Sequence, residues 1–179
     1  PRQIALLEAL NLEIPEFIHV ALFTGDDGAP LSKRNGSLSV KELKEIGYFP
    51  QAVINYLSRV GHVIPDNELR DLEGLSTVFN VDNISTSPSR IDHDQLTFWQ
   101  KNVIESKSIE ELSSWLESHL KNLPKDIDQE SFVELIKDNI VFPNEAVEYL
   151  DNLFVNSLSS IKEVEDLIKQ SGSNFFKLA

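Results

Sequence analysis

The spacing of apolar residues along this 179-residue chain predicts a mainly helical protein. Apolar side chains recur every three or four positions, which is the pattern of an amphipathic helix with one buried face. These stripes predict helices over residues 2–10, 39–47, 50–61, 69–78, 92–103, 108–123, 132–140, 143–154 and 159–170. The expected buried faces include Val53, Ile54, Leu57 and Val60 in the helix 50–61, and Phe132, Leu135, Ile136 and Ile140 in the helix 132–140. Residues 17–23 differ because they are almost continuously apolar, and we expect a buried strand there.

Short polar signals mark where several of these helices begin and end. Ser39 precedes Glu42 by three residues and Ser108 precedes Glu111 by three, so each pair can form a capping box. We expect Gly47 to end the helix that begins at Ser39, in a left-handed conformation. The polar run 85–89 interrupts the periodic pattern, and we place a domain boundary near it.

The segment 25–39 carries the strongest chemical signal in the chain, since it holds three glycines, a proline and two adjacent cations. Such a loop can present backbone N–H groups, the Ser32 hydroxyl and the charges of Lys33 and Arg34 to one phosphate. Lys33 could then stabilise charge that develops during phosphoryl or nucleotidyl transfer. A solvated surface turn with two exposed cations explains the same residues equally well. The glycine spacing excludes a Walker-type P-loop.

Several further motifs occur in a fixed order around this segment. They are Pro15-Glu16-Phe17-Ile18-His19, Leu31-Ser32-Lys33-Arg34, Gly47-Tyr48-Phe49-Pro50-Gln51-Ala52, Tyr56-Leu57-Ser58-Arg59-Val60-Gly61, and Phe79-Asn80-Val81 through Ser87-Pro88-Ser89-Arg90-Ile91-Asp92. In this order and spacing the chain resembles bacterial glutamyl-tRNA synthetases, from Pro1 to about Asn102. In that family the second motif is the KMSKS signature loop of class I aminoacyl-tRNA synthetases.

The resemblance implies an ATP site at the signature loop, formed by Leu31, Ser32, Lys33 and Arg34. Lys33 matches the catalytic lysine, which binds the ATP phosphates and stabilises the transition state for adenylate formation. Pro30 stands where the family has the first lysine of the signature, so one cation is missing from the site. The resemblance also implies that Mg²⁺ accompanies ATP in the intact enzyme, and we expect no metal site in this chain.

The second class I signature, a His-x-Gly-His-type motif, does not occur around any of the four histidines. We therefore expect a fragment, lacking most of the catalytic domain and part of the anticodon-binding domain, that is not active alone. The resemblance implies that the intact enzyme joins glutamate to the 3′ end of its tRNA at the expense of ATP. It leaves open whether glutamine tRNA is a second acceptor, and we expect a monomer.

The amino-acid composition excludes several kinds of covalent link, metal site and membrane segment. The chain has no cysteine, so neither a disulfide nor a cysteine-based zinc site is possible. No segment has the length and apolar character of a membrane span or a signal peptide, and we expect a cytoplasmic protein.

The net charge of −13 opposes RNA binding by the molecule as a whole, but its distribution is uneven. Between Pro30 and His62 stand five cations and two anions, so this stretch carries +3 and the remaining residues carry −16. An electrostatic footprint for RNA can be confined to one such stretch. Within it, Lys41 and Arg59 are the candidate tRNA-binding residues.

Other side chains allow a functional and a purely structural interpretation. Trp99 and Trp115 could stack on bases, but their registry with leucines favours core packing. His93 lies between Asp92 and Asp94, and a helix N-terminal cap explains this cluster better than a metal site. The alternative to a synthetase is a non-enzymatic acidic helical scaffold for protein–protein interaction, and the basic, glycine-bracketed loop argues against it.

We therefore predict a mainly α protein of three regions. Residues 1–38 end a class I nucleotide-binding fold and include the KMSKS-like loop. Residues 39–90 form a stem-contact helical region, and residues 91–179 form an incomplete α-helical bundle of the anticodon-binding type.

Overall fold

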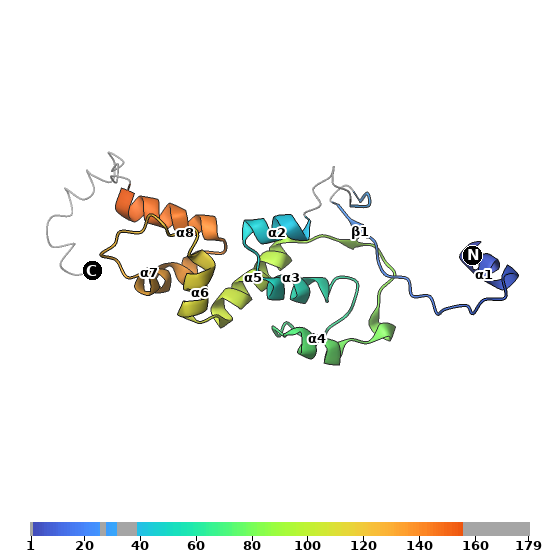
Figure 1. Ribbon diagram of the computed structural model, residues 1–179. Coiled ribbons are helices and arrows are strands. Elements are labelled where there is room, and N and C mark those ends of the chain that lie inside the picture. The colour runs from blue at the N-terminus through green and yellow to red at the C-terminus, as the bar shows by residue number, and fades with distance from the viewer. Residues whose placement is uncertain (1, 26–27, 32–38, 156–179) are drawn as a thin grey trace. The chain divides into compact units, whose positions relative to one another are not determined.

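A computed structural model describes residues 2–25, 28–31 and 39–155 (Figure 1). Ser32, Lys33, Arg34 and the predicted helix 159–170 lie outside the described residues. The elements are α1 (Arg2–Ala9), β1 (Phe23–Thr24), α2 (Val40–Ile46), α3 (Pro50–Leu57), α4 (Leu72–Val78), the 3₁₀ turn η1 (Val81–Asn83), β2 (Ser89–Arg90), α5 (His93–Ser106), α6 (Ile109–Leu116), α7 (Gln129–Ile136), the 3₁₀ turn η2 (Lys137–Asn139), α8 (Pro143–Leu150) and the π-helical turn η3 (Asp151–Val155).

The described part of the chain is mainly helical, as the apolar periodicity predicted, and both capping boxes are formed. The Ser39 N–H donates to the Glu42 carboxylate and the Ser39 hydroxyl accepts the Glu42 N–H, at 2.6 and 3.2 Å. Ser108 and Glu111 make the same two bonds at the start of α6. Because caps and glycine stops act locally, they place helix ends that apolar spacing alone places loosely.

The predicted buried strand over residues 17–23 is wrong in extent and in burial. Only Phe23–Thr24 has strand pairing, and Phe17, Ile18, Val20 and Leu22 are 47–69% exposed. A strand is defined by its ladder partners, and among the described residues this segment finds them only at its C-terminal end. The apolar run was informative about composition but could not reveal which segments pair with it.

The chain forms two compact units that do not coincide with contiguous halves. The first unit comprises Pro1–Glu45 and Phe49–Gln100, and the second comprises Ile46–Tyr48 and Lys101–Ala179. The division after Gln100 lies inside α5, whereas the sequence placed a boundary near residues 85–89. The three functional regions predicted from the sequence stay predictions.

In the first unit, buried side chains come from α3, from the segment that follows α3, from α4 and from the first half of α5. They are Ala52, Asn55, Tyr56, His62, Leu75, Leu96, Trp99 and Gln100. The predicted stripe of α3 is shifted by tertiary packing, since Leu57 is exposed whereas Asn55 is fully buried. A polar residue thus occupies the centre of this face, and its hydrogen bonds become important below.

In the second unit, α6 contacts both α7 and α8. Its core consists of Val103, Ile104, Leu112, Leu116, Leu120, Phe132, Val133, Ile136, Ile140, Ala146 and Leu150. Leu135 was predicted to share this face but is exposed, and Val133 is buried in its place. The helix predicted to continue to residue 123 ends at Leu116, after which a turn leads towards Pro124.

Candidate functional site

The signature segment begins on a closed hairpin base. The Leu31 N–H donates to the Phe23 carbonyl and the Gly25 N–H donates to the Ala29 carbonyl, both at 3.0 Å. Thr24 and Pro30 face each other in an antiparallel bridge. These bonds fix the backbone up to Leu31, the residue directly before Ser32.

The hairpin base is paired in turn with the Ser-Pro-Ser-Arg segment far along the chain. Phe23 lies opposite Ser89 and Thr24 opposite Arg90 in a parallel two-stranded sheet. The Ser89 N–H donates to the Leu22 carbonyl at 3.0 Å. One motif of the family resemblance therefore lies beside the strand that leads into the signature segment.

Tyr56 on α3 is bonded to the residue that follows this paired segment. The Asp92 N–H donates to the Tyr56 hydroxyl oxygen at 2.8 Å, and Tyr56 is buried. Burial raises the pKa of Tyr56, so the phenol stays protonated. Asp92 also accepts the Gln95 N–H at 3.0 Å and caps α5, as predicted. No local pattern predicts the Tyr56 bond, because Tyr56 and Asp92 lie 36 positions apart in the chain.

His93 is the exposed first residue of α5, next to this cap. Within the described ranges, no three histidine, aspartate or glutamate side chains gather in a way that could hold a metal ion. The same part of the chain contains no helix long and apolar enough to cross a membrane.

Of the candidate site residues, the structure describes Leu31, Lys41 and Arg59, and these three differ in burial and in their contacts. Leu31 is half-buried at the hairpin base. Lys41 is on α2 with its side chain 84% exposed, and its ammonium lies 3.7 Å from the exposed Glu45 carboxylate. Because exposed ion pairs are weak, Lys41 can exchange this partner for a phosphate.

Arg59, by contrast, is committed to partners inside the first unit. Its side chain is 10% exposed, and its guanidinium donates to the carbonyls of Asn55 and Glu68 at 3.0 and 2.8 Å. Its Cζ lies 4.1 Å from the centroid of the Trp99 ring, within cation–π range. Burial lowers the pKa of Arg59 without approaching neutrality, because an arginine stays charged in proteins. These contacts give Arg59 a structural role in this unit, and its contact with RNA stays a prediction.

A second arginine and two carboxylates surround Arg59. Arg70 forms a two-pronged bond with Asp66, at 2.5 and 3.0 Å, and a further bond with Glu68 at 2.7 Å. The bond from Arg70 lowers the pKa of Asp66 to about 2. The Asn55 side chain completes the cluster, donating to the Arg70 carbonyl and accepting the Arg70 N–H. Asn55, Arg59, Asp66, Arg70 and Trp99 are called the arginine cluster below.

The two tryptophans pack as their leucine registry predicted. Trp99 is 2% exposed and forms part of the arginine cluster. Trp115 is half-buried, and its indole N–H donates to the Gly47 carbonyl at 3.2 Å. Base stacking by either ring would require it to leave these contacts.

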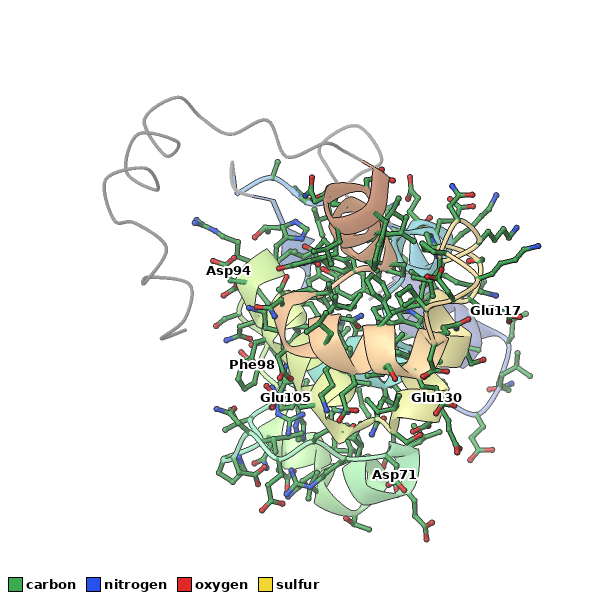
Figure 2. All side chains as sticks on the ribbon, turned by 90° about the vertical axis from the view of Figure 1, so that its left-hand side faces the viewer. Asp71, Asp94, Phe98, Glu105, Glu117 and Glu130 are labelled. Atoms are coloured by element: carbon green, nitrogen blue, oxygen red, sulfur yellow. The ribbon has the colours of Figure 1, made fainter. Side chains whose placement is uncertain are left out.

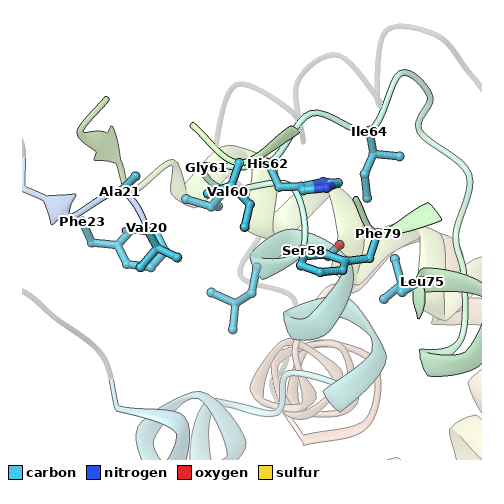
Figure 3. A pocket seen from close by; sticks show the side chains of 12 residues that line it. Val20, Ala21, Phe23, Ser58, Val60, Gly61, His62, Ile64, Leu75 and Phe79 are labelled. Atoms are coloured by element: carbon cyan, nitrogen blue, oxygen red, sulfur yellow. The ribbon is translucent and has the colours of Figure 1, made fainter. Parts of the chain in front are cut away.

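The first unit also contains an apolar pocket of about 380 Å³ beside β1 (Figure 3). Figure 3 shows Val20, Ala21 and Phe23 on one side and Leu75 and Phe79 on the other. This lining contains no lysine or arginine, so it is poorly suited to the phosphates of a nucleotide.

Acidic side chains are prominent on the described surface. Glu105, Glu117 and Glu130 are exposed on α5, the turn after α6, and α7 (Figure 2). They belong to the part of the chain that carries most of the negative charge. A phosphate backbone would be repelled from them, which leaves the basic stretch around α2 as the better candidate for RNA.

Comparison with known proteins identifies the class. Residues 1–98, more than half of the chain, match the family described as tRNA synthetases class I (E and Q), catalytic domain. The chain belongs to this family of class I aminoacyl-tRNA synthetases. The matched range includes the hairpin base, the signature segment, α2, α3 and β2.

The chain is also similar in sequence to individual proteins, and two of them are glutamate–tRNA ligases. The chain is 40% identical over its whole length to glutamate–tRNA ligase 2 of Alkalilimnicola ehrlichii. It is 41% identical, again over its whole length, to glutamate–tRNA ligase 1 of Halorhodospira halophila. The chain spans about 38% of the length of the first and 37% of the second.

Among solved structures, a glutamate tRNA ligase from Elizabethkingia meningosepticum, crystallised with its amino acid, superposes with a TM-score of 0.78. At 18% identity it shows the fold alone, over 92% of this chain and 37% of that one. These likenesses do not favour the acidic-scaffold alternative.

Proposed function

We propose that this chain supplies part of a glutamate–tRNA ligase, which activates glutamate with ATP and transfers it to the 3′ end of tRNA. The observation that carries the proposal is the family match over residues 1–98, in which Leu-Ser-Lys-Arg follows a hairpin base held to the Ser-Pro-Ser-Arg segment. The hydrogen bonds of the hairpin base hold the backbone in place up to Leu31. The residues that follow therefore start from a defined point, as a site that holds a triphosphate requires.

At this site, Leu31, Ser32, Lys33 and Arg34 bind ATP and Lys33 is the catalytic residue. Attack of the glutamate carboxylate on the α-phosphorus forms the adenylate and expels pyrophosphate, so negative charge builds up on the departing oxygens. A lysine ammonium placed there stabilises this charge more in the transition state than in the ground state. Mg²⁺ enters with ATP as part of the substrate.

The exposed cations of α2 supply a contact for the tRNA backbone, with Lys41 as its centre. The helices after residue 91 form part of the anticodon-binding bundle, and their acidic surface limits them to contacts other than phosphate. The acceptor is glutamate tRNA, glutamine tRNA is the alternative to be compared with it, and the protein acts as a monomer.

Binding of the chain to glutamate and glutamine tRNAs at two or more salt concentrations tests the RNA contact. Lys41→Ala should weaken binding and reduce the slope of log K against log salt by about one. Lys125→Ala is the matched control, because Lys125 is also an exposed lysine but lies in the second unit, outside the basic stretch. Equal losses for the two variants would refute a contact centred on Lys41.

Pyrophosphate exchange tests the catalytic assignment. The chain replaces the matching segment of the Alkalilimnicola ligase, to which it is 40% identical. Lys33→Ala should lower the rate of glutamate-dependent exchange by about a hundredfold or more, as expected for loss of a transition-state contact. An unchanged rate in this variant would remove Lys33 from the chemistry.

A further inference from the structure

The hairpin base and the Ser-Pro-Ser-Arg segment form one small sheet within the first unit. Thr24 lies at its centre, since it faces Pro30 in an antiparallel bridge on one side and Arg90 in the parallel pair on the other. The Ile91 N–H donates to the Thr24 carbonyl at 3.3 Å. Pro30, Thr24 and Arg90 are therefore aligned across three neighbouring backbone segments.

The two faces of this small sheet differ in their surroundings. Side chains of residues aligned across a sheet lie on the same face, and those of consecutive residues lie on opposite faces. Phe23 and Ser89 are half-buried on one face, where Phe23 lines the apolar pocket (Figure 3). Pro30 and Arg90 lie on the other face and are exposed. The face formed by Thr24, Pro30 and Arg90 is called the outer face below.

Arg90 is the charged member of the outer face. Among the residues that the structure describes, Arg90 forms no ion pair, whereas Arg59 and Arg70 are both held by carboxylates. A solvated guanidinium presents its planar fork to phosphate oxygens and can bind two of them at once. Arg90 can therefore bind an incoming phosphate without giving up a carboxylate from this part of the chain.

Pro30 gives this charge a particular meaning. It stands where the resembled family has the first lysine of its signature, so that position carries no cation here. Neighbouring segments of a sheet lie about 5 Å apart, so the backbones of residues 30 and 90 are about 10 Å apart across the outer face. The long arginine side chain can span much of this distance. Position 90 thus brings a cation to the face on which position 30 has none.

We propose that Arg90 binds a phosphate group of a substrate at the outer face, as the cation that Pro30 does not supply. The inference rests on the proposed function, which brings ATP and the 3′ end of tRNA to the neighbourhood of the hairpin base. It uses Thr24, Pro30 and Arg90, all in the first unit. ATP and the tRNA end offer the same phosphate chemistry, and the experiment below distinguishes them.

Two other roles for Arg90 predict different results. A charge at a sheet edge can serve only to oppose pairing with other chains. Asp26 and Asp27, which lie outside the described residues, come two and three positions after Thr24 and could neutralise Arg90. In the first case Arg90→Ala leaves substrate binding unchanged, and in the second its effect depends on the two carboxylates.

Kinetics of the chimeric ligase described above test the phosphate contact. Arg90→Ala should raise the KM for ATP at saturating tRNA, or the dissociation constant of tRNA, by about fivefold or more, as expected for loss of a charge-assisted bond. The constant that rises more identifies the ligand. The KM for glutamate, which has no phosphate, should not change. Arg2→Ala is the matched control, because Arg2 is an exposed arginine of the first unit that lies on α1, outside the small sheet.

Pro30→Lys distinguishes a cation of the outer face from a general surface charge. Added to Arg90→Ala, it returns a cation to this face and should recover about half or more of the loss on a logarithmic scale, whereas independent sites would show simple additivity. Arg90→Lys should fall between the parent and Arg90→Ala, since it keeps the charge without the planar fork. In a background of Asp26→Asn and Asp27→Asn, Arg90→Ala should keep its effect.

Three results would overturn the proposal. They are unchanged constants for both ATP and tRNA in Arg90→Ala, an equal rise in the KM for glutamate, and loss of the Arg90→Ala effect in the Asp26→Asn and Asp27→Asn background. The two proposals also fail in different ways. A Lys33→Ala chimera that keeps its exchange rate contradicts the proposed function, whatever Arg90→Ala does. An inactive Lys33→Ala chimera beside an unaffected Arg90→Ala chimera contradicts only the role of Arg90.

Discussion

Replacing Arg59 should destabilise the protein substantially while leaving its affinity for tRNA intact. Arg59→Met keeps an unbranched apolar side chain but removes the guanidinium from the arginine cluster. The two carbonyls of Asn55 and Glu68 lose short bonds from a charged donor. The ring of Trp99 loses a cation at 4.1 Å.

The magnitude follows from these contacts. Each hydrogen bond from a charged donor contributes about 1.5 kcal/mol, and the cation–π contact adds about 1 kcal/mol. Removing the charge recovers about 1 kcal/mol, because Arg59 is desolvated and lies close to the like charge of Arg70. We therefore expect a loss of about 3 kcal/mol in the free energy of unfolding.

Urea denaturation measures this loss. Arg90→Met is the matched control, because Arg90 is exposed on β2, and its stability should change by less than about 0.5 kcal/mol. Arg59→Lys should fall between the parent and Arg59→Met, since a lysine keeps the charge but not the planar fork. An Arg59→Met variant as stable as the parent, with reduced tRNA affinity, would refute the structural assignment and restore Arg59 as an RNA contact.

Three further outcomes follow from the described contacts. The pKa of Asp66 is lowered to about 2, below its unfolded value, so its contribution to stability is present above about pH 4 and is lost as the pH falls to about 2. In melting curves across this range, Asp66→Asn should show a smaller acid-side decline than the parent, and an identical decline would exclude Asp66 as its source. Ser108→Ala removes the acceptor of the Glu111 N–H at the α6 cap and should cost about 1 kcal/mol, whereas a loss below about 0.3 kcal/mol would mean that water replaces it. Leu116→Ala, at the fully buried C-terminal end of α6, should cost about 2–5 kcal/mol, and a milder effect would show that this core collapses around the cavity.

The elements that the sequence predicted well are those determined by neighbouring residues. Ser39 and Ser108 specify their capping boxes within four residues, and Asp92 caps α5 in the same local way. The strand over residues 17–23 failed for the opposite reason, because strand formation depends on partners elsewhere in the chain. Leu57 and Leu135 were assigned to buried faces by periodicity alone, and tertiary packing turned both outwards.

The candidate site residues likewise differ in whether neighbouring residues or distant contacts identify them. Leu31, Ser32, Lys33 and Arg34 were predicted from their order in a motif, which needs no tertiary knowledge, and their role stays a prediction. Arg59 was selected because it is a cation near that motif, and only the structure shows its commitment to Asn55, Glu68 and Trp99. Nothing in the sequence pointed to Trp115 and Gly47 as partners, because a bond between an indole and a distant carbonyl has no local signature.

The membership of Ile46–Tyr48 in the second unit has a consequence for how this protein could be divided in evolution or in the laboratory. The chain passes between the units after Glu45, after Tyr48 and after Gln100, so no single cut yields two complete units. A gene break near residues 85–89, where the polar run invites one, would leave Trp115 and Phe142 on one piece and Gly47 and Tyr48 on the other. If the C-terminal helices were exchanged between related proteins, the new helices would pack well only where residues 46–48 of the recipient already fit them. A division that keeps the second unit complete must therefore keep residues 46–48 together with residues 101–179.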